Sequence, residues 1–264
     1  MKTTTLILNL VLLAELAFAA VQPTLRYDLS GEMQLSMEQE IFVDSREEAI
    51  ATRNFSMTFD LGNARDNDEL LVTLASITGN YTAHGMKQRL PSSHLTGGEF
   101  RLLGDGRSFK SQEEDRGEVP LGTITDGGLR PSELLAGLLP TLPDAPVSVG
   151  TTWIADRSIL SLEGWACAGG EMQHHHEVTD IQQSNGRTVI HVKTHGETAI
   201  EAAEGHEGFV GLGTLAQRID WTFDADSGQL LSLSVEREAS GTNLLPQGEI
   251  QVRQIARYTL LTDL

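Results

Sequence analysis

The stretch IQQSNGRTVIHV, residues 181–192, contains the clearest signal for the fold of this chain. Its centre, Asn185-Gly186, suits a two-residue type I′ turn, because both central positions of that turn need a positive φ. With these residues at the turn, Ser184 pairs with Arg187 and the flanking strands run antiparallel. The stretch therefore predicts a β-hairpin of defined register.

Alternating apolar and polar residues continue this strand pattern over most of the chain. Phe55, Met57 and Phe59, for example, alternate with polar residues, as expected of a strand with one buried face. We expect strands over residues 25–37, 55–59, 70–77, 100–103, 107–110, 151–157, 171–182, 187–195, 213–224, 229–238 and 248–260. Because tight turns join consecutive strands, the pattern predicts an antiparallel β meander or half-barrel of about 10–11 strands.

One short helix is expected near residues 131–139. Pro131 is tolerated in the first turn of a helix, and the later prolines at 140 and 143 end it. Between them, four leucines at helical spacing form one apolar stripe: Leu134, Leu135, Leu138 and Leu139. The expected fold is therefore mainly β, with one short helix packed onto the sheet.

The first residues predict export. Lys2, the apolar run from Leu6 to Leu13 and the motif Ala17-Phe18-Ala19 are typical of a secretory signal peptide over residues 1–19. This run is too short for a stable anchor, and no later stretch is apolar enough for a transmembrane segment. We expect residues 20–264 to form a single exported β domain, or two halves split near 140–150. The expected location is periplasmic or extracellular.

Charge and cysteine content narrow the class of partner. A net charge of −18 argues against nucleic acid, because so acidic a chain repels the phosphate backbone. Cys167 is the only cysteine, so no disulfide can form within the chain and stability must come from core burial. This lone cysteine and the excess of arginine over lysine favour a bacterial periplasmic protein over a eukaryotic secreted one.

Several stretches resemble a known family of bacterial proteins. They are LTGGEFRLLGDGRSF (95–109), LPDAPVSVGTTW (142–153), GFVGLG (208–213) and IDWTFDADSGQLLSLSV (219–235). Together they resemble a family of exported bacterial proteins catalogued as a domain of unknown function, and the VGTTW motif (149–153) is the most specific match. At the level of fold, the pattern is similar to the periplasmic half-barrels of the LolA, LolB and LppX type. That likeness implies an open antiparallel sheet holding helices against its concave face, and it brings no catalytic residues.

The run MQHHHEVTD (172–180) raises the question of a metal site. A uniform register from the Asn-Gly turn places His176 opposite His195 and His174 opposite Glu197. These four residues would then share one face of the hairpin, at spacings that suit zinc or copper. The alternative is that they are ordinary polar residues on a solvated face.

Motifs of catalysis are weak throughout. The sequence has no G-x-S-x-G, H-E-x-x-H or C-x-x-C motif. Asp226-Ser227-Gly228 matches the Asp-Ser/Thr-Gly triplet of aspartic proteases. The residues before it, Asp224-Ala225, are typical of a hairpin turn and not of the apolar strand that precedes the triplet in those enzymes. We therefore expect a protein that is not an enzyme and needs no cofactor.

Three functions remain open. The favoured one is an exported β protein that binds a hydrophobic or amphiphilic ligand in a half-barrel groove, with the four leucines and Trp153 lining or plugging that groove. The second is an envelope structural or interaction module that has a protein partner and no small ligand. The third is a metal-binding protein that uses the histidine cluster, with Glu197 as a further ligand.

Overall fold

A computed structural model describes residues 22–262, except for 45, 63–68, 84, 90–95, 112–118, 121–127, 159–164, 168–170, 185, 203–209 and 246–247. The signal peptide predicted over residues 1–19 and the turn residue Asn185 lie outside the described residues. The elements are β1 Gly31–Val43, β2 Ala51–Gly62, β3 Glu69–Ala83, β4 Met86–Arg89, β5 Glu99–Gly104, β6 Phe109–Ser111, β7 Val119–Pro120, β8 Gly128–Leu129, α2 Pro131–Leu138, β9 Thr152–Ser158, β10 Trp165–Cys167, β11 Glu171–Ser184, β12 Arg187–Ala202, β13 Val210–Asp224, β14 Gln229–Leu245 and β15 Gly248–Thr262.

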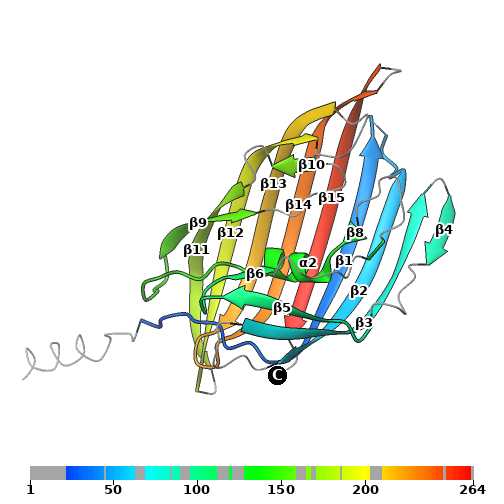
Figure 1. Ribbon diagram of the computed structural model, residues 1–264. Helices are drawn as coiled ribbons and strands as arrows, with labels where there is room; N and C mark the ends of the chain where they lie inside the picture. Colours follow the sequence, from blue (N-terminus) through cyan, green and yellow to red (C-terminus); the bar gives the residue numbers. More distant parts are fainter. Residues whose placement is uncertain are drawn as a thin grey trace, which may run out of the picture.

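Thirteen strands form one antiparallel sheet (Figure 1). Their order is β6-β5-β3-β2-β1-β15-β14-β13-β12-β11-β9, with β4 beside β3 and β10 beside β12, while β7 and β8 pair separately. Among the described residues no pairing joins β6 to β9, so the sheet is open. The predicted mainly β, antiparallel fold with one short helix is confirmed, and the sheet has a few more strands than expected.

The topology brings the first and last strands of the chain together at the centre of the sheet. β1 pairs with β15, so the strands before α2 extend from one side of this central pair and the strands after it from the other. Between the two groups, α2 lies against one face of the sheet (Figure 1). We call this the inner face and the opposite one the outer face.

The inner face contains the apolar core. Along each long strand, every second residue is buried, and the alternate residues are exposed on the outer face. One large cluster joins side chains of α2, of residues 22–30 and of strands from both groups, before and after α2 in the chain. A smaller cluster of Ile41, Ala51, Tyr81 and Val252 lies apart from it on the inner face.

Residues 22–30 form an extended segment that packs on this core. Leu25, Tyr27 and Leu29 are buried in the main cluster. The amide of Asp28 donates to the carbonyl of Gly228 at 2.9 Å, and the Tyr27 hydroxyl donates to the carbonyl of Pro140 at 2.7 Å. The segment thereby links the hairpin between β13 and β14 to the chain that follows α2.

Helix α2 matches the sequence prediction in position and in role. It begins at Pro131, and Leu139 is its C-cap. Its four leucines are fully buried in the main cluster, as the apolar stripe predicted. No helix within the described part of the chain is both long and apolar enough to cross a bilayer.

Candidate functional site

A β-bulge in β11 determines which histidines face the core. The hairpin follows the predicted register next to its turn, with Ser184 opposite Arg187, but the pairing shifts by one residue at Thr179. Beyond the shift, His176 lies opposite Thr194 and His175 lies opposite His195. A bulge adds one residue to a single strand, so every side chain beyond it changes face relative to the partner strand.

Because of the bulge, the four residues of the predicted metal site do not lie on one face of the hairpin. His174 and His176 lie buried on the inner face, whereas His195 and Glu197 are exposed on the outer face. His195 stacks instead on His175, with ring centroids 5.2 Å apart. The prediction that His174, His176, His195 and Glu197 share a face is therefore wrong. Within the described residues, no three His, Cys, Asp or Glu side chains are grouped as metal ligands.

The VGTTW motif attaches the chain after α2 to β11 at this bulge. Gly150 has a φ of 84°, a conformation that favours glycine, and its amide donates to the carbonyl of Val178 at 2.8 Å. The amide of Val178 donates in return to the carbonyl of Thr151 at 2.9 Å. The motif is thus a turn that leads into β9 and fixes β9 beside β11.

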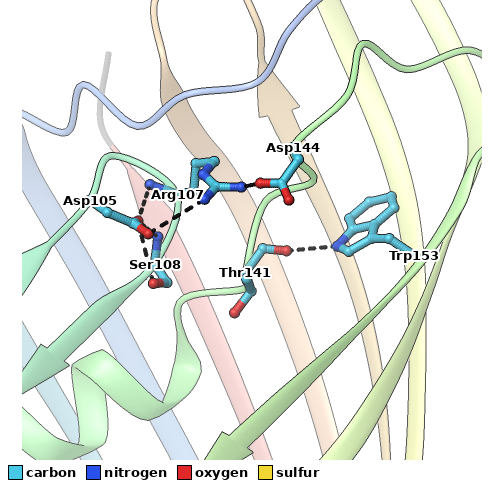
Figure 2. A network of polar contacts seen from close by, with 6 residues as sticks. All are labelled: Asp105, Arg107, Ser108, Thr141, Asp144 and Trp153. Atoms are coloured by element: carbon cyan, nitrogen blue, oxygen red, sulfur yellow. Dashed lines mark hydrogen bonds and ion pairs between the residues drawn. The ribbon is translucent and has the colours of Figure 1, made fainter.

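Trp153, a predicted ligand contact, packs between the sheet and the chain after α2. Its indole nitrogen donates to the carbonyl of Thr141 at 2.9 Å, and Arg107 forms an ion pair with Asp144 nearby (Figure 2). The indole ring also stacks on His176, with centroids 4.7 Å apart and planes 6° apart. These contacts give Trp153 a packing role. Together with the buried leucines of α2, it fills this part of the inner face.

Next to this apolar region, a row of polar side chains crosses the inner face. Gln217 lies opposite Arg237, Arg237 opposite Ala256, Ala256 opposite Gln39, Gln39 opposite Arg53, and Arg53 opposite Tyr81. Gly196 lies opposite Gln217 and continues the row to His174. All of the members with polar side chains are buried, and we call this set the polar row: His174, Gln217, Arg237, Gln39, Arg53 and Tyr81.

Arg237 lies near the middle of the polar row and is only 1% exposed. Its Nε donates to Gln217 Oε1 at 3.0 Å, and its guanidinium lies over the Tyr258 ring, 5.2 Å from the ring centroid. Arg157, on β9, is buried as well and donates from Nη2 to the carbonyl of Ala136 at 3.1 Å, in the last turn of α2. Burial lowers the pKa of Arg157, and the positive charge of Arg237 lowers it too, so the two cations act on each other.

Both inner-face histidines are neutral at pH 7. The pKa of His174 is lowered to about 4, first by burial and then by the charges of Arg157 and Arg237. The pKa of His176 is lowered to about 3, mainly by burial and next by His174. Each side chain is only 2% exposed.

Several buried polar atoms of this region have no hydrogen-bond partner. In the part of the chain that the structure describes, they include Arg237 Nη1, Gln217 Nε2, both ring nitrogens of His174 and Nε2 of His176. Orphaned buried groups of this kind are rare in native proteins and each is costly. Gly196 allows Met172 and His174 to pack closely against β12, because a Cβ there would lie only 2.6 Å from Met172 Sδ and 2.8 Å from His174 Cδ2.

Comparison with known proteins adds little to this geometry. No family model and no curated protein matches the chain. A solved structure titled "Lipid-protein interactions in lipovitellin" is similar over 89% of this chain, with 11% identity and a TM-score of 0.44. The match covers only 25% of that longer chain. The resemblance to the exported bacterial family and to the LolA-type half-barrels thus stays a prediction.

The sequence analysis did not predict the polar row, although the pattern of the strands contains a signal for it. In β14, for example, the inner positions Leu233, Val235 and Ala239 are apolar, and Arg237 interrupts them. Gln217 interrupts the inner positions of β13 in the same way. A polar residue in the apolar phase of a strand is the signal that indicates such a site.

Replacing Arg237 with methionine is expected to stabilise the ligand-free protein. The side chain keeps most of its length, while an uncompensated buried charge is removed. We expect the free energy of unfolding to rise by about 1 kcal/mol or more, as when other buried charges are replaced by apolar side chains. Urea denaturation measures the change. A fall in stability would show that the contacts with Gln217 and Tyr258 outweigh the cost of burying the charge.

Proposed function

We propose that this protein is an exported, non-enzymatic binding protein that holds an amphiphilic ligand against the inner face of its half-barrel. The observation that supports the proposal is the make-up of that face. On that face the buried apolar main cluster borders a row of buried polar side chains, some with unpartnered atoms. An amphiphile, with one apolar and one polar part, matches such a surface.

The buried leucines of α2 limit which part of the inner face a ligand could contact. Because they already fill the inner face beside residues 22–30, that part is core. The ligand would instead contact the polar row and the apolar residues on its far side, including Leu215, Ala239 and the smaller cluster with Val252. Export and the absence of catalysis rest on the sequence pattern alone and are parts of the proposal.

The direct test is native mass spectrometry of untagged protein purified from the envelope fraction without a nickel column. We expect an added mass that organic solvent removes, and we expect stripped protein to regain it from a lipid extract. A bare chain that takes up no amphiphile from the extract would contradict the proposal. An added metal ion that is lost on acidification would support the metal-binding alternative.

One observation favours a second function, an interaction module of the cell envelope. The main cluster is filled by the protein's own side chains, as expected of a sheet that encloses no ligand. In that case the outer face or the end strands β6 and β9 would contact a protein partner. Failure to bind any amphiphile, together with a partner captured by crosslinking in the envelope, would favour this function.

A further inference from the structure

Two buried arginines of the inner face have no acidic partner among the described residues. Arg157 and Arg237 lie on the inner face, and no described carboxylate forms an ion pair with either. Their close neighbours are the neutral groups Tyr27, Gln217 and Tyr258 and the neutral histidine His174. Burying a charge is costly unless an opposite charge or a dense set of hydrogen bonds compensates it.

Around Arg237, several nitrogen atoms have no hydrogen-bond partner among the described residues. Its Nη1 has no partner in the described structure, although its Nε is held by Gln217 and its face by Tyr258. Gln217 Nε2 and the ring nitrogens of His174 are also unpartnered, and they belong to the same polar row. Gly196 and Ala256 lie on either side of this pair in the row, and the side chains of Met172 and His174 pack directly over Gly196.

We propose that Arg237, assisted by Arg157, Gln217 and His174, binds the anionic head group of the amphiphile, a carboxylate or a phosphate. This inference rests on the proposed function and specifies its ligand. Guanidinium groups bind such oxyanions through paired, charge-assisted hydrogen bonds. An anion there would supply the missing countercharge and accept from the donors that are otherwise orphaned.

The position of the polar row favours an amphiphile over a small free anion. Apolar side chains border the row on both sides, with Ile219 and Val235 in the adjacent row on one side and Leu215 and Ala239 on the other. A head group at Arg237 would therefore place its apolar chain directly against buried aliphatic residues. A free phosphate or acetate would gain only the charged contacts.

The experiment measures the affinity of full-length mature protein, stripped of ligand, for matched probes by titration calorimetry. The probes are palmitate, its uncharged methyl ester, hexadecyl phosphate, acetate and inorganic phosphate. We expect the two long-chain anions to bind about tenfold more tightly than the ester, or better, as one charge-assisted contact predicts. We expect Arg237→Met to reduce that preference to about threefold or less while ester binding stays unchanged.

A matched control separates the site from general charge. Arg257 directly follows Ala256, which lies between Arg237 and Gln39 in the row. Its side chain points to the outer face instead, where it is 46% exposed and pairs with Glu40 and Glu236. Arg257→Met should keep the full preference for the anions. Far-ultraviolet circular dichroism and the melting temperature confirm that both variants are folded.

The outcomes distinguish this inference from the function on which it depends. Equal affinity of the wild type for palmitate and its ester, or an unchanged preference in Arg237→Met, would overturn the head-group site and leave amphiphile binding intact. Failure to bind any long-chain probe would refute the proposed function itself. Binding of inorganic phosphate as tight as hexadecyl phosphate would show a small-anion site and overturn the amphiphile assignment.

Discussion

Acidification from pH 7 to pH 5 is expected to remove about 4 kcal/mol of stability, about 2 kcal/mol for each inner-face histidine. His174 and His176 have ordinary pKa values near 6.5 when unfolded, and about 4 and 3 in the folded protein. The unfolded state therefore binds protons as the pH falls below 6.5, while the folded state does not. Stability is lost from pH 6.5 down to the folded pKa values and levels off below them.

A loss of this size is a large part of the stability of a typical domain. Urea denaturation at half-unit steps between pH 7 and pH 4.5 measures it. Replacing both His174 and His176 with phenylalanine should flatten the profile over this range. Replacing His175 and His195, the stacked pair on the outer face, with glutamine should leave the slope unchanged. Equal slopes in the two double variants would contradict the assignment of the acid sensitivity to the inner face.

The long strands and the helix were predictable because they depend on local patterns, whereas the short strands β4, β7, β8 and β10 were not expected and residues 25–30, expected as strand, form none. Alternation of apolar and polar residues depends on the period of two in a strand, and the helix follows from leucine spacing between prolines. The Asn-Gly turn also fixed the pairing of Ser184 with Arg187, as observed. Each of these features needs only a short window of sequence.

The faces of the histidines were not predictable from the turn alone, because the bulge at Thr179 shifts the register. The uniform register placed Val178 opposite Lys193, on the polar face. The observed shift pairs Val178 with Val192 and Glu177 with Lys193, which matches apolar with apolar and acid with base. This better match of residue types across the strands was already visible in the sequence and favours a register with a bulge.

The polar row could not be assembled from the sequence, because it depends on the relative register of eight neighbouring strands. Arg237 and Gln39 are far apart in the chain and become near neighbours only through the pairing of β15 with both β14 and β1. Each polar residue alone looks like a local exception to the alternation. Only the pairings in the sheet show that the exceptions fall on one line.

Replacing Leu135 with aspartate is expected to unfold the whole protein, with a loss of more than about 4 kcal/mol. Leu135 is fully buried in the main cluster, which joins α2 to strands of both halves of the sheet and to residues 22–30. A carboxylate at that position would replace a side chain with 0% exposure inside the apolar cluster, where burying a charge is costly. Because the helix is part of one continuous core, it cannot leave the inner face without exposing that core.

The matched variant Leu135→Met conserves volume and polarity and should cost less than about 1.5 kcal/mol. Differential scanning calorimetry and far-ultraviolet circular dichroism compare the two variants with the wild type. A single transition that is lost in Leu135→Asp and kept in Leu135→Met would place α2 in the folding core. Retention of a stable sheet in Leu135→Asp would instead show that α2 is a detachable plug. In that case ligand would enter where the leucines pack, because a released helix would expose the apolar side chains of the main cluster.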